Sequence, residues 1–262
     1  MRCLNTALRW QMSSQPPISV LNAVRLTLRS QPFAGCTGRG IRVAVVDSGI
    51  AAGHPHVGEV SRGVSLVGAV DSDYGDRIGH GTAVAAAIRE KAPDVELLSV
   101  RVFDRTLETS VDTLATGMRW AADQGAQLIN LSLGTPNEER NAVLRHALDY
   151  ATERGAVVVA ATDNDGRPVL PGALPGAIGV RLERHCERDE LVLDVDELRR
   201  SNRWQIGASG YPRPIPGVPP ERNLFGISFA VANATGFLAR LIESGSAPAE
   251  FFRELVRAGE AR

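Results

Sequence analysis

Three short segments of this chain each carry a residue type that is used in nucleophilic catalysis. The apolar run at 41–49 delivers Asp47 near its end, His80 stands in Gly-His-Gly-Thr, and Ser228 stands in Gly-Ile-Ser-Phe-Ala. A carboxylate, an imidazole and a hydroxyl are the three parts of a site that transfers an acyl group through a serine. We therefore predict Asp47, His80 and Ser228 as the catalytic residues.

Each of the three has a simpler interpretation when taken alone. Ser228 and His80 would each suit the cap of a helix, because polar side chains are favoured there. Asp47 could instead be a metal ligand or the nucleophile of a phosphatase-like site, but such sites need a second acidic residue where this chain has Gly49. We interpret His54 and His56 as structural loop residues, and we predict no metal site.

The segments that must position these residues alternate between strand and helix patterns. Apolar strand-like runs lie at Ile41–Val46, Val95–Val102, Gln127–Leu133, Ala156–Ala161 and Ala177–Leu182. Helical patterns lie at Gly81–Lys91, Val111–Gln124, Glu138–Arg154 and Phe229–Glu243. Near-continuous apolar strands separated by amphipathic helices predict a three-layer, doubly wound α/β fold with a mostly parallel sheet. Functional groups in such sheets gather at the carboxyl ends of the strands, where Asp47 lies.

The order Asp, His, Ser and the local motifs resemble those of subtilisin-like serine proteases, from about residue 40 to about residue 244. Asp-Ser-Gly-Ile at 47–50 and His-Gly-Thr-x-Val-Ala at 80–85 match the family pattern completely. The serine segment is similar to Gly-Thr-Ser-Met-Ala-x-Pro but carries Ile227, Phe229 and Ala232 in place of Thr, Met and Pro. The resemblance implies a subtilisin-like fold and a serine endopeptidase that works through an acyl-enzyme.

The resemblance also implies an asparagine that donates to the oxyanion of the reaction intermediate. The run Ala-Ala-Thr-Asp-Asn-Asp-Gly at 160–166 is one residue longer than the family's Ala-Ala-Gly-Asn, so either Asn164 or Asp163 occupies that place. A carboxylate facing an oxyanion is electrostatically unfavourable. We therefore expect Asn164 to be the donor.

The same resemblance implies a pocket for the substrate side chain before the scissile bond, the P1 side chain. One wall is expected from the strand Ser132-Leu133-Gly134, whose free edge can also pair with an extended peptide. The opposite wall is expected from Ala160, Ala161 and Thr162. A threonine in place of the family's glycine would make this pocket tighter or more polar.

Composition narrows the choice of partner. The chain has 262 residues, a net charge of −1 and 44% hydrophobic residues, which is ordinary for one globular domain and gives no argument for nucleic acid. No apolar run is long enough to span a bilayer. The partner we expect is a peptide or protein substrate, with no nucleic acid and no membrane. No acidic loop has the spacing of a calcium site, so we predict no cofactor.

We divide the chain into residues 1–39, 40–245 and 246–262. The first is an extension with a short helix over Ile18–Arg29, the second is the peptidase domain, and the third is a helix docked through Phe251 and Phe252. The charged stretch Glu183–Arg200 contains Leu191–Leu193, for which we expect a surface strand or hairpin.

Three scattered cysteines and no secretory signal favour free thiols and a cytoplasmic location. An extension of 1–39 is short for the pro-segment that secreted family members carry, so we expect a compact intracellular form with a dedicated substrate, such as a precursor peptide. The altered serine segment leaves open an alternative, a catalytically silent fold that binds a peptide or partner. A nucleotide-binding fold is disfavoured, because the glycines at 35, 38 and 40 precede the strand that they would have to follow.

Overall fold

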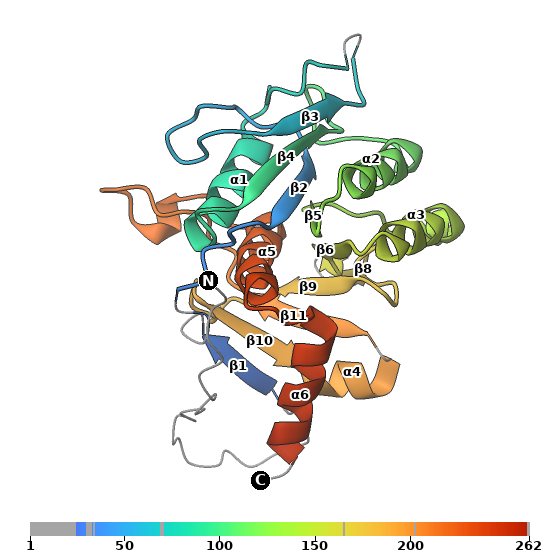
Figure 1. The fold of residues 1–262 in the computed structure, drawn as a ribbon, viewed down its shortest axis with the longest axis vertical. Helices are drawn as coiled ribbons and strands as arrows, with labels where there is room; N and C mark the ends of the chain where they lie inside the picture. Colours follow the sequence, from blue (N-terminus) through green and yellow to red (C-terminus); the bar gives the residue numbers. More distant parts are fainter. Residues whose placement is uncertain are drawn as a thin grey trace.

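The computed structural model describes residues 33, 35–68, 71–164, 166–201 and 203–260, and the backbone of 25–29. It contains a nine-stranded sheet with the order β1-β10-β11-β9-β6-β5-β2-β4-β3 (Figure 1). The strands are β1 (Arg25–Arg29), β2 (Arg42–Asp47), β3 (Arg62–Ser65), β4 (Glu96–Arg101), β5 (Leu128–Leu131), β6 (Val157–Ala161), β9 (Ile178–Leu182), β10 (Glu190–Asp194) and β11 (Trp204–Ala208). A separate two-stranded ribbon consists of β7 (Asp163–Asn164) and β8 (Arg167–Pro168).

The centre of the sheet is parallel, and its β1 edge is antiparallel. All neighbours from β11 to β3 pair in parallel, whereas β10 pairs antiparallel with both β11 and β1. This is the predicted three-layer, doubly wound α/β arrangement with a mostly parallel sheet.

Helices cover both faces of the sheet (Figure 1). One face carries α1 (His80–Lys91) and α5 (Ile227–Glu243), with α6 (Pro248–Glu260) packed against α5. The other carries α2 (Val111–Asp123) and α3 (Asn141–Glu153), which follows the 3₁₀ turn Glu138–Arg140. The short α4 (Val195–Ser201) joins β10 to β11, and a second 3₁₀ turn, Pro220–Arg222, precedes α5.

The alternation of side chains along a strand decides which face each residue serves. In β2, Val43 and Val45 belong to the core under α1 and α5, whereas Ala44 and Val46 belong to the core under α2 and α3. Since successive side chains point to opposite faces, Asp47 continues the first set. By the same alternation, the side chains of Asn130 in β5 and of Ser132 just after it point toward α5.

Helices α1 and α5 pack closely where Gly236 of α5 faces the last turn of α1. A β-carbon on Gly236 of α5 would come 2.6 Å from the β-carbon of Lys91 and 3.0 Å from the carbonyl oxygen of Ile88. No residue larger than glycine fits there without a shift of the helices. The amino ends of the two helices lie at the carboxyl ends of β2 and β5, where His80 contacts Asp47 and Ser228 contacts Ser132.

Two expectations for the β1 edge of the sheet are wrong. Residues 25–29, expected in a helix, form the strand β1, which pairs with β10. Their sequence, Arg-Leu-Thr-Leu-Arg, alternates polar and apolar residues, which is the period of a strand. Residues 18–24 lie outside the described part. Leu191–Leu193 forms the expected strand, β10, but the strand is not on the surface: it lies inside the sheet, and Leu191 and Leu193 are fully buried.

The tail ends in α6, where Phe251 and Phe252 are buried. Their rings contact Phe33 and Trp204, with ring centroids 5.6 Å and 5.5 Å apart. None of the helices in the described part of the chain is both long and apolar enough to cross a membrane.

Candidate active site

Asp47 ends β2 and is completely buried. Its Oδ1 accepts a hydrogen bond from the backbone N–H of Ser48 at 2.7 Å and lies 2.7 Å from Nδ1 of His80. Burying a carboxylate is costly unless it is hydrogen-bonded or paired. The imidazole of His80 is therefore the partner that makes this position suitable for a charge.

His80 is the first residue of α1 and follows Gly79, whose φ of +93° lies in the left-handed region that favours glycine. The next residue, Gly81, allows the first turn of α1 to approach the end of β2. A β-carbon on Gly81 would overlap the carbonyl oxygen of Gly49 and lie 3.2 Å from Cβ of Asp47. The glycines around His80 therefore hold its ring against Asp47.

A second carboxylate, Asp76, organises the same turn and was not anticipated from the sequence. Its Oδ1 accepts hydrogen bonds from the hydroxyl of Ser48 and from the backbone N–H groups of Ile78 and Gly79, at 2.8–2.9 Å. Its Oδ2 accepts from the backbone N–H and the hydroxyl of Thr82. These bonds hold the pKa of Asp76 below its usual value, although burial acts in the opposite direction. Asp76 is thus an anion at the amino end of α1.

Two carboxylates near His80 raise the pKa of its imidazole. Burial works to lower the pKa of His80, but the hydrogen bond and charge of Asp47, together with the charge of Asp76, outweigh it and raise the pKa above its ordinary value. Since Nδ1 faces Asp47, Nε2 is the ring nitrogen left to exchange a proton.

Ser228 is the second residue of α5 and is not its cap, since Gly226 occupies that place. The hydroxyl of Ser228 donates to the backbone carbonyl of Ser132 at 3.2 Å, and the hydroxyl of Ser132 donates to the carbonyl of Ser228 at 3.1 Å. The described side chains of Ser228 and His80 share no hydrogen bond. The two segments are nevertheless adjacent, because the ring of Phe229 lies 6.1 Å from the His80 ring, centroid to centroid.

A pocket of about 320 Å³ opens beside Ser228. It is lined by Ser132, Leu133, Gly134, Pro136, Ala161, Asp163, Arg167, Val169 and Ile227. Four of the six residues predicted to form the P1 pocket are among them. Ala160 and Thr162 are not, and Ala160 lies in the core under α2 and α3.

Two charged residues of this pocket come from the ribbon formed by β7 and β8. Asp163 is half-buried, and its Oδ1 accepts the N–H of Gly166 at 3.3 Å; Arg167 is exposed. The two side chains form no ion pair with each other. Asn164 lies in β7, but its side chain is outside the described part of the structure. The expectation that Asn164 donates to the oxyanion therefore stays a prediction.

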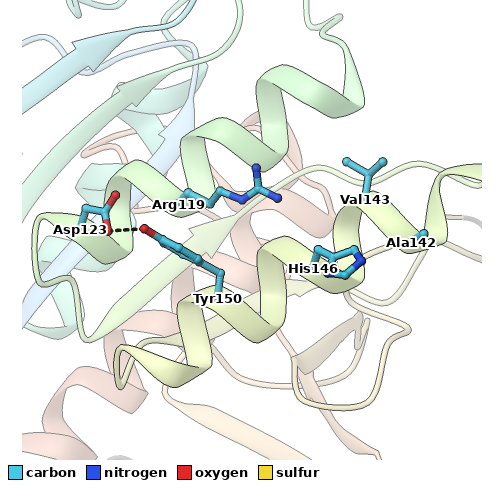
Figure 2. A pocket seen from close by; sticks show the side chains of 6 residues that line it. All are labelled: Arg119, Asp123, Ala142, Val143, His146 and Tyr150. Carbon is cyan, nitrogen blue, oxygen red and sulfur yellow. Dashed lines mark hydrogen bonds between the residues drawn. The ribbon is translucent and has the colours of Figure 1, made fainter.

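A second hollow, of about 600 Å³, lies on the other side of the sheet between α2 and α3 (Figure 2). Its lining residues are Arg119, Asp123, Ala142, Val143, His146 and Tyr150. In it the hydroxyl of Tyr150 donates to Asp123 at 2.8 Å. None of the residues predicted to act in catalysis lies there. Among the residues that the structure describes, no group of three or more His, Cys, Asp or Glu side chains is placed to hold a metal ion.

Comparison with known proteins shows which family this chain resembles. Residues 38–254 match the profile of the Subtilase family. Subtilisin Savinase of Lederbergia lenta is 40% identical over 210 residues, covering 77% of this chain and 72% of that protein. An alkaline protease of Alkalihalobacillus alcalophilus is also 40% identical over 210 residues, but the match covers 51% of it. The chain thus spans about half the length of some of its relatives.

The solved structure of Sphericase superposes with a TM-score of 0.62 at 24% identity, covering 80% of each chain, and supports the fold. Taken with the match over residues 38–254 and the relatives at 40% identity, this establishes the family. The chain belongs to the subtilase family.

Proposed function

We propose that this protein is a serine endopeptidase that hydrolyses peptide bonds through Asp47, His80 and Ser228. The observation that carries the proposal is the 2.7 Å contact between His80 Nδ1 and the buried Asp47, beside a helix whose second residue is Ser228. A histidine that is held by a carboxylate at one ring nitrogen can act as a base through the other.

In this proposal Ser228 Oγ attacks the substrate carbonyl carbon while Nε2 of His80 takes the hydroxyl proton. Asp47 stabilises the imidazolium that forms. When the C–N bond breaks, the imidazolium gives its proton to the leaving amine and an ester on Ser228 remains. Water then attacks the ester, with His80 again acting as the base, and releases the acid and the free serine.

Two features beside Ser228 serve the other needs of the reaction. The amino end of α5 would direct backbone N–H groups toward the developing oxyanion, and Asn164 would add a side-chain donor. The pocket formed by Ser132–Gly134, Ala161 and Ile227 would receive the P1 side chain. Its two charged residues support a selective enzyme, such as one that processes a precursor peptide, over one that digests proteins in bulk.

The proposal is tested by incubating the protein with a defined mixture of peptides and mapping the new termini by mass spectrometry. We expect cleavage at a narrow set of sequences, and a loss of about 10⁴-fold or more in rate for Ser228→Ala. Cleavage of unfolded casein as fast as of any peptide would reject the selective role.

The hydrogen bond from Ser228 to Ser132 favours a second candidate, a catalytically silent fold that binds peptides. In this bond the hydroxyl of Ser228 donates to a backbone carbonyl and not to His80. Peptide binding by parent and Ser228→Ala alike, with no cleavage by either, would support this candidate over the first.

A further inference from the structure

We propose that Thr235 is a positioning residue for Ser228, acting through Asn130 and Ser132. The inference rests on the proposed function and adds residues to its site. The hydroxyl of Thr235 donates to Oδ1 of Asn130 at 2.9 Å, and Nδ2 of Asn130 donates to the hydroxyl of Ser132 at 3.0 Å. That hydroxyl in turn donates to the carbonyl of Ser228 at 3.1 Å. We call this series of bonds the Thr235 relay.

The periodicities of a helix and a strand explain why these residues meet. Thr235 follows Ser228 by seven residues, which is two turns, so both lie on the face of α5 that packs on the sheet. Asn130 and Ser132 are two residues apart, so both side chains leave β5 on the side of α5. The relay therefore joins helix and strand at two levels, one at Thr235 and one at Ser228.

The relay lies in the core. Thr235 and Asn130 are fully buried, and Ser132 is 8% exposed. In the core, each donor and acceptor must find its partner within the protein. The donor-to-acceptor direction of one hydrogen bond in the relay therefore determines the direction of the next bond. The hydroxyl of Thr235 is also within hydrogen-bond distance of the carbonyl of Val231, at 2.8 Å. Its single proton can serve one of the two acceptors, and we assign it to Asn130, because the carbonyl of Val231 already accepts a backbone N–H within the helix.

Loss of the Thr235 hydroxyl would change the hydrogen bonds of the Asn130 amide, and through them the hydrogen bond between Ser132 and Ser228. Oδ1 of Asn130 would then lie in the core without a donor, and a flip of the amide would turn it toward the hydroxyl of Ser132, which lies 3.0 Å from Nδ2. Because that hydroxyl has one proton, giving it to Asn130 removes it from the carbonyl of Ser228. The first turn of α5 would lose one of its two hydrogen bonds to Ser132, and Ser228 would be held less firmly beside the pocket wall.

The test compares Thr235→Val, which has nearly the same shape, with Thr235→Ser, which keeps the hydroxyl. Thr152→Val is the matched control, because the hydroxyl of Thr152 makes the same bond to the carbonyl four residues earlier, in α3. We expect Thr235→Val to react with a fluorophosphonate about tenfold more slowly, with the pH midpoint of the reaction unchanged. Thr235→Ser and Thr152→Val should react like the parent.

Amide hydrogen exchange in a peptide spanning 227–231 is read in parallel and does not depend on catalysis. We expect faster exchange there in Thr235→Val than in the other two variants. If Thr235→Val matches the parent in both measurements, the relay is wrong. If no variant and no parent reacts but exchange rises in Thr235→Val, the relay stands and the proposed peptidase function fails.

Discussion

The hydroxyl of Ser228 donates to the backbone carbonyl of Ser132, 3.2 Å away, although the His80 ring that would deprotonate it is held next to the same helix turn. Hydrogen bonds of a catalytic serine are often formed only when substrate binds. A peptide that adds to the free edge beyond β5 would compete for the Ser132 carbonyl, and rotation about one side-chain bond would then turn the hydroxyl toward His80. Substrate binding and serine activation would in this way be coupled.

Replacement of Asp76 by Asn should shift the pH dependence of activity. Asp76 and Asp47 both raise the pKa of His80, and His80 can act as a base only when neutral. Removing one negative charge lowers that pKa, so the acid limb of the kcat/KM profile should move to lower pH. Asp73→Asn is the control, because Asp73 pairs with Arg77 and its charge is not among those that raise the pKa of His80. A shift of the limb to higher pH in Asp76→Asn would contradict the assignment.

The same pKa shift has a consequence for stability. A group whose pKa is raised on folding stabilises the native state below its unfolded pKa, about 6.5 for histidine, and loses that effect as pH rises through the folded pKa. His80→Gln should therefore reduce the free energy of unfolding more at pH 5.5 than at pH 9. Urea unfolding at the two pH values measures the difference, and an equal loss at both would show that protonated His80 gains nothing on folding.

Asp163 should influence the choice of P1 residue. Its half-buried carboxylate lines the pocket beside Ser228, where an ammonium group of a bound lysine gains about 1–2 kcal/mol. In Asp163→Asn, the ratio of kcat/KM for P1 lysine to that for P1 norleucine should fall about tenfold. Arg167→Gln provides the matched comparison and should instead lower the ratio of P1 glutamate to norleucine. Unchanged ratios in both variants would mean that neither charge reaches the P1 side chain.

Gly81→Ala tests the close approach of α1 to β2. Alanine is the better helix former by about 1 kcal/mol, yet its β-carbon would overlap the carbonyl of Gly49. We expect a net loss of about 1–3 kcal/mol in the free energy of unfolding. Gly117→Ala in α2 is the control, because there the added carbon meets only methyl groups at 3.1–3.4 Å. Equal stability of the two variants would count against this packing.

Cys186 should be inert in the folded protein. Burial, with the charges of Glu190 and Glu183, raises the pKa of its thiol to about 12, and the thiol donates to the carbonyl of Glu190 at 3.2 Å. Alkylation requires the thiolate. Peptide mapping after iodoacetamide at pH 8 should find Cys186 unmodified without denaturant and modified in it. Rapid labelling of native protein would contradict the described environment.

The sequence predicted the elements that carry the site better than it predicted the edge of the sheet. Apolar runs such as Ile41–Val46 are long and bounded by glycine, so the strand follows from pattern alone. The strand β10 was misjudged because its three buried residues are flanked by Glu190 and Asp194, which resemble a solvated segment. The burial of β10 depends on its neighbours β1 and β11, and the local sequence pattern does not predict which strands lie beside it.

The polar residues that support the site were missed for a related reason. Asp76, Asn130 and Thr235 are common residue types, and their roles arise from partners distant in the sequence, such as the pairing of Asn130 with Thr235 over 105 positions. A carboxylate four residues before His80 was a usable signal for Asp76, as an acidic group near a helix start. Nothing in the sequence singles out Thr235 among the small residues of α5.

Intact mass after exposure to a fluorophosphonate, with Ser228→Ala beside the parent, tests the central claim most directly. An activated serine displaces fluoride from the reagent and keeps the phosphonyl group, so we expect one adduct on the parent, on the peptide that contains Ser228. The Ser228→Ala variant should carry none. An unmodified parent that is folded, or an adduct that persists in Ser228→Ala, would contradict the assignment of Ser228 as the nucleophile.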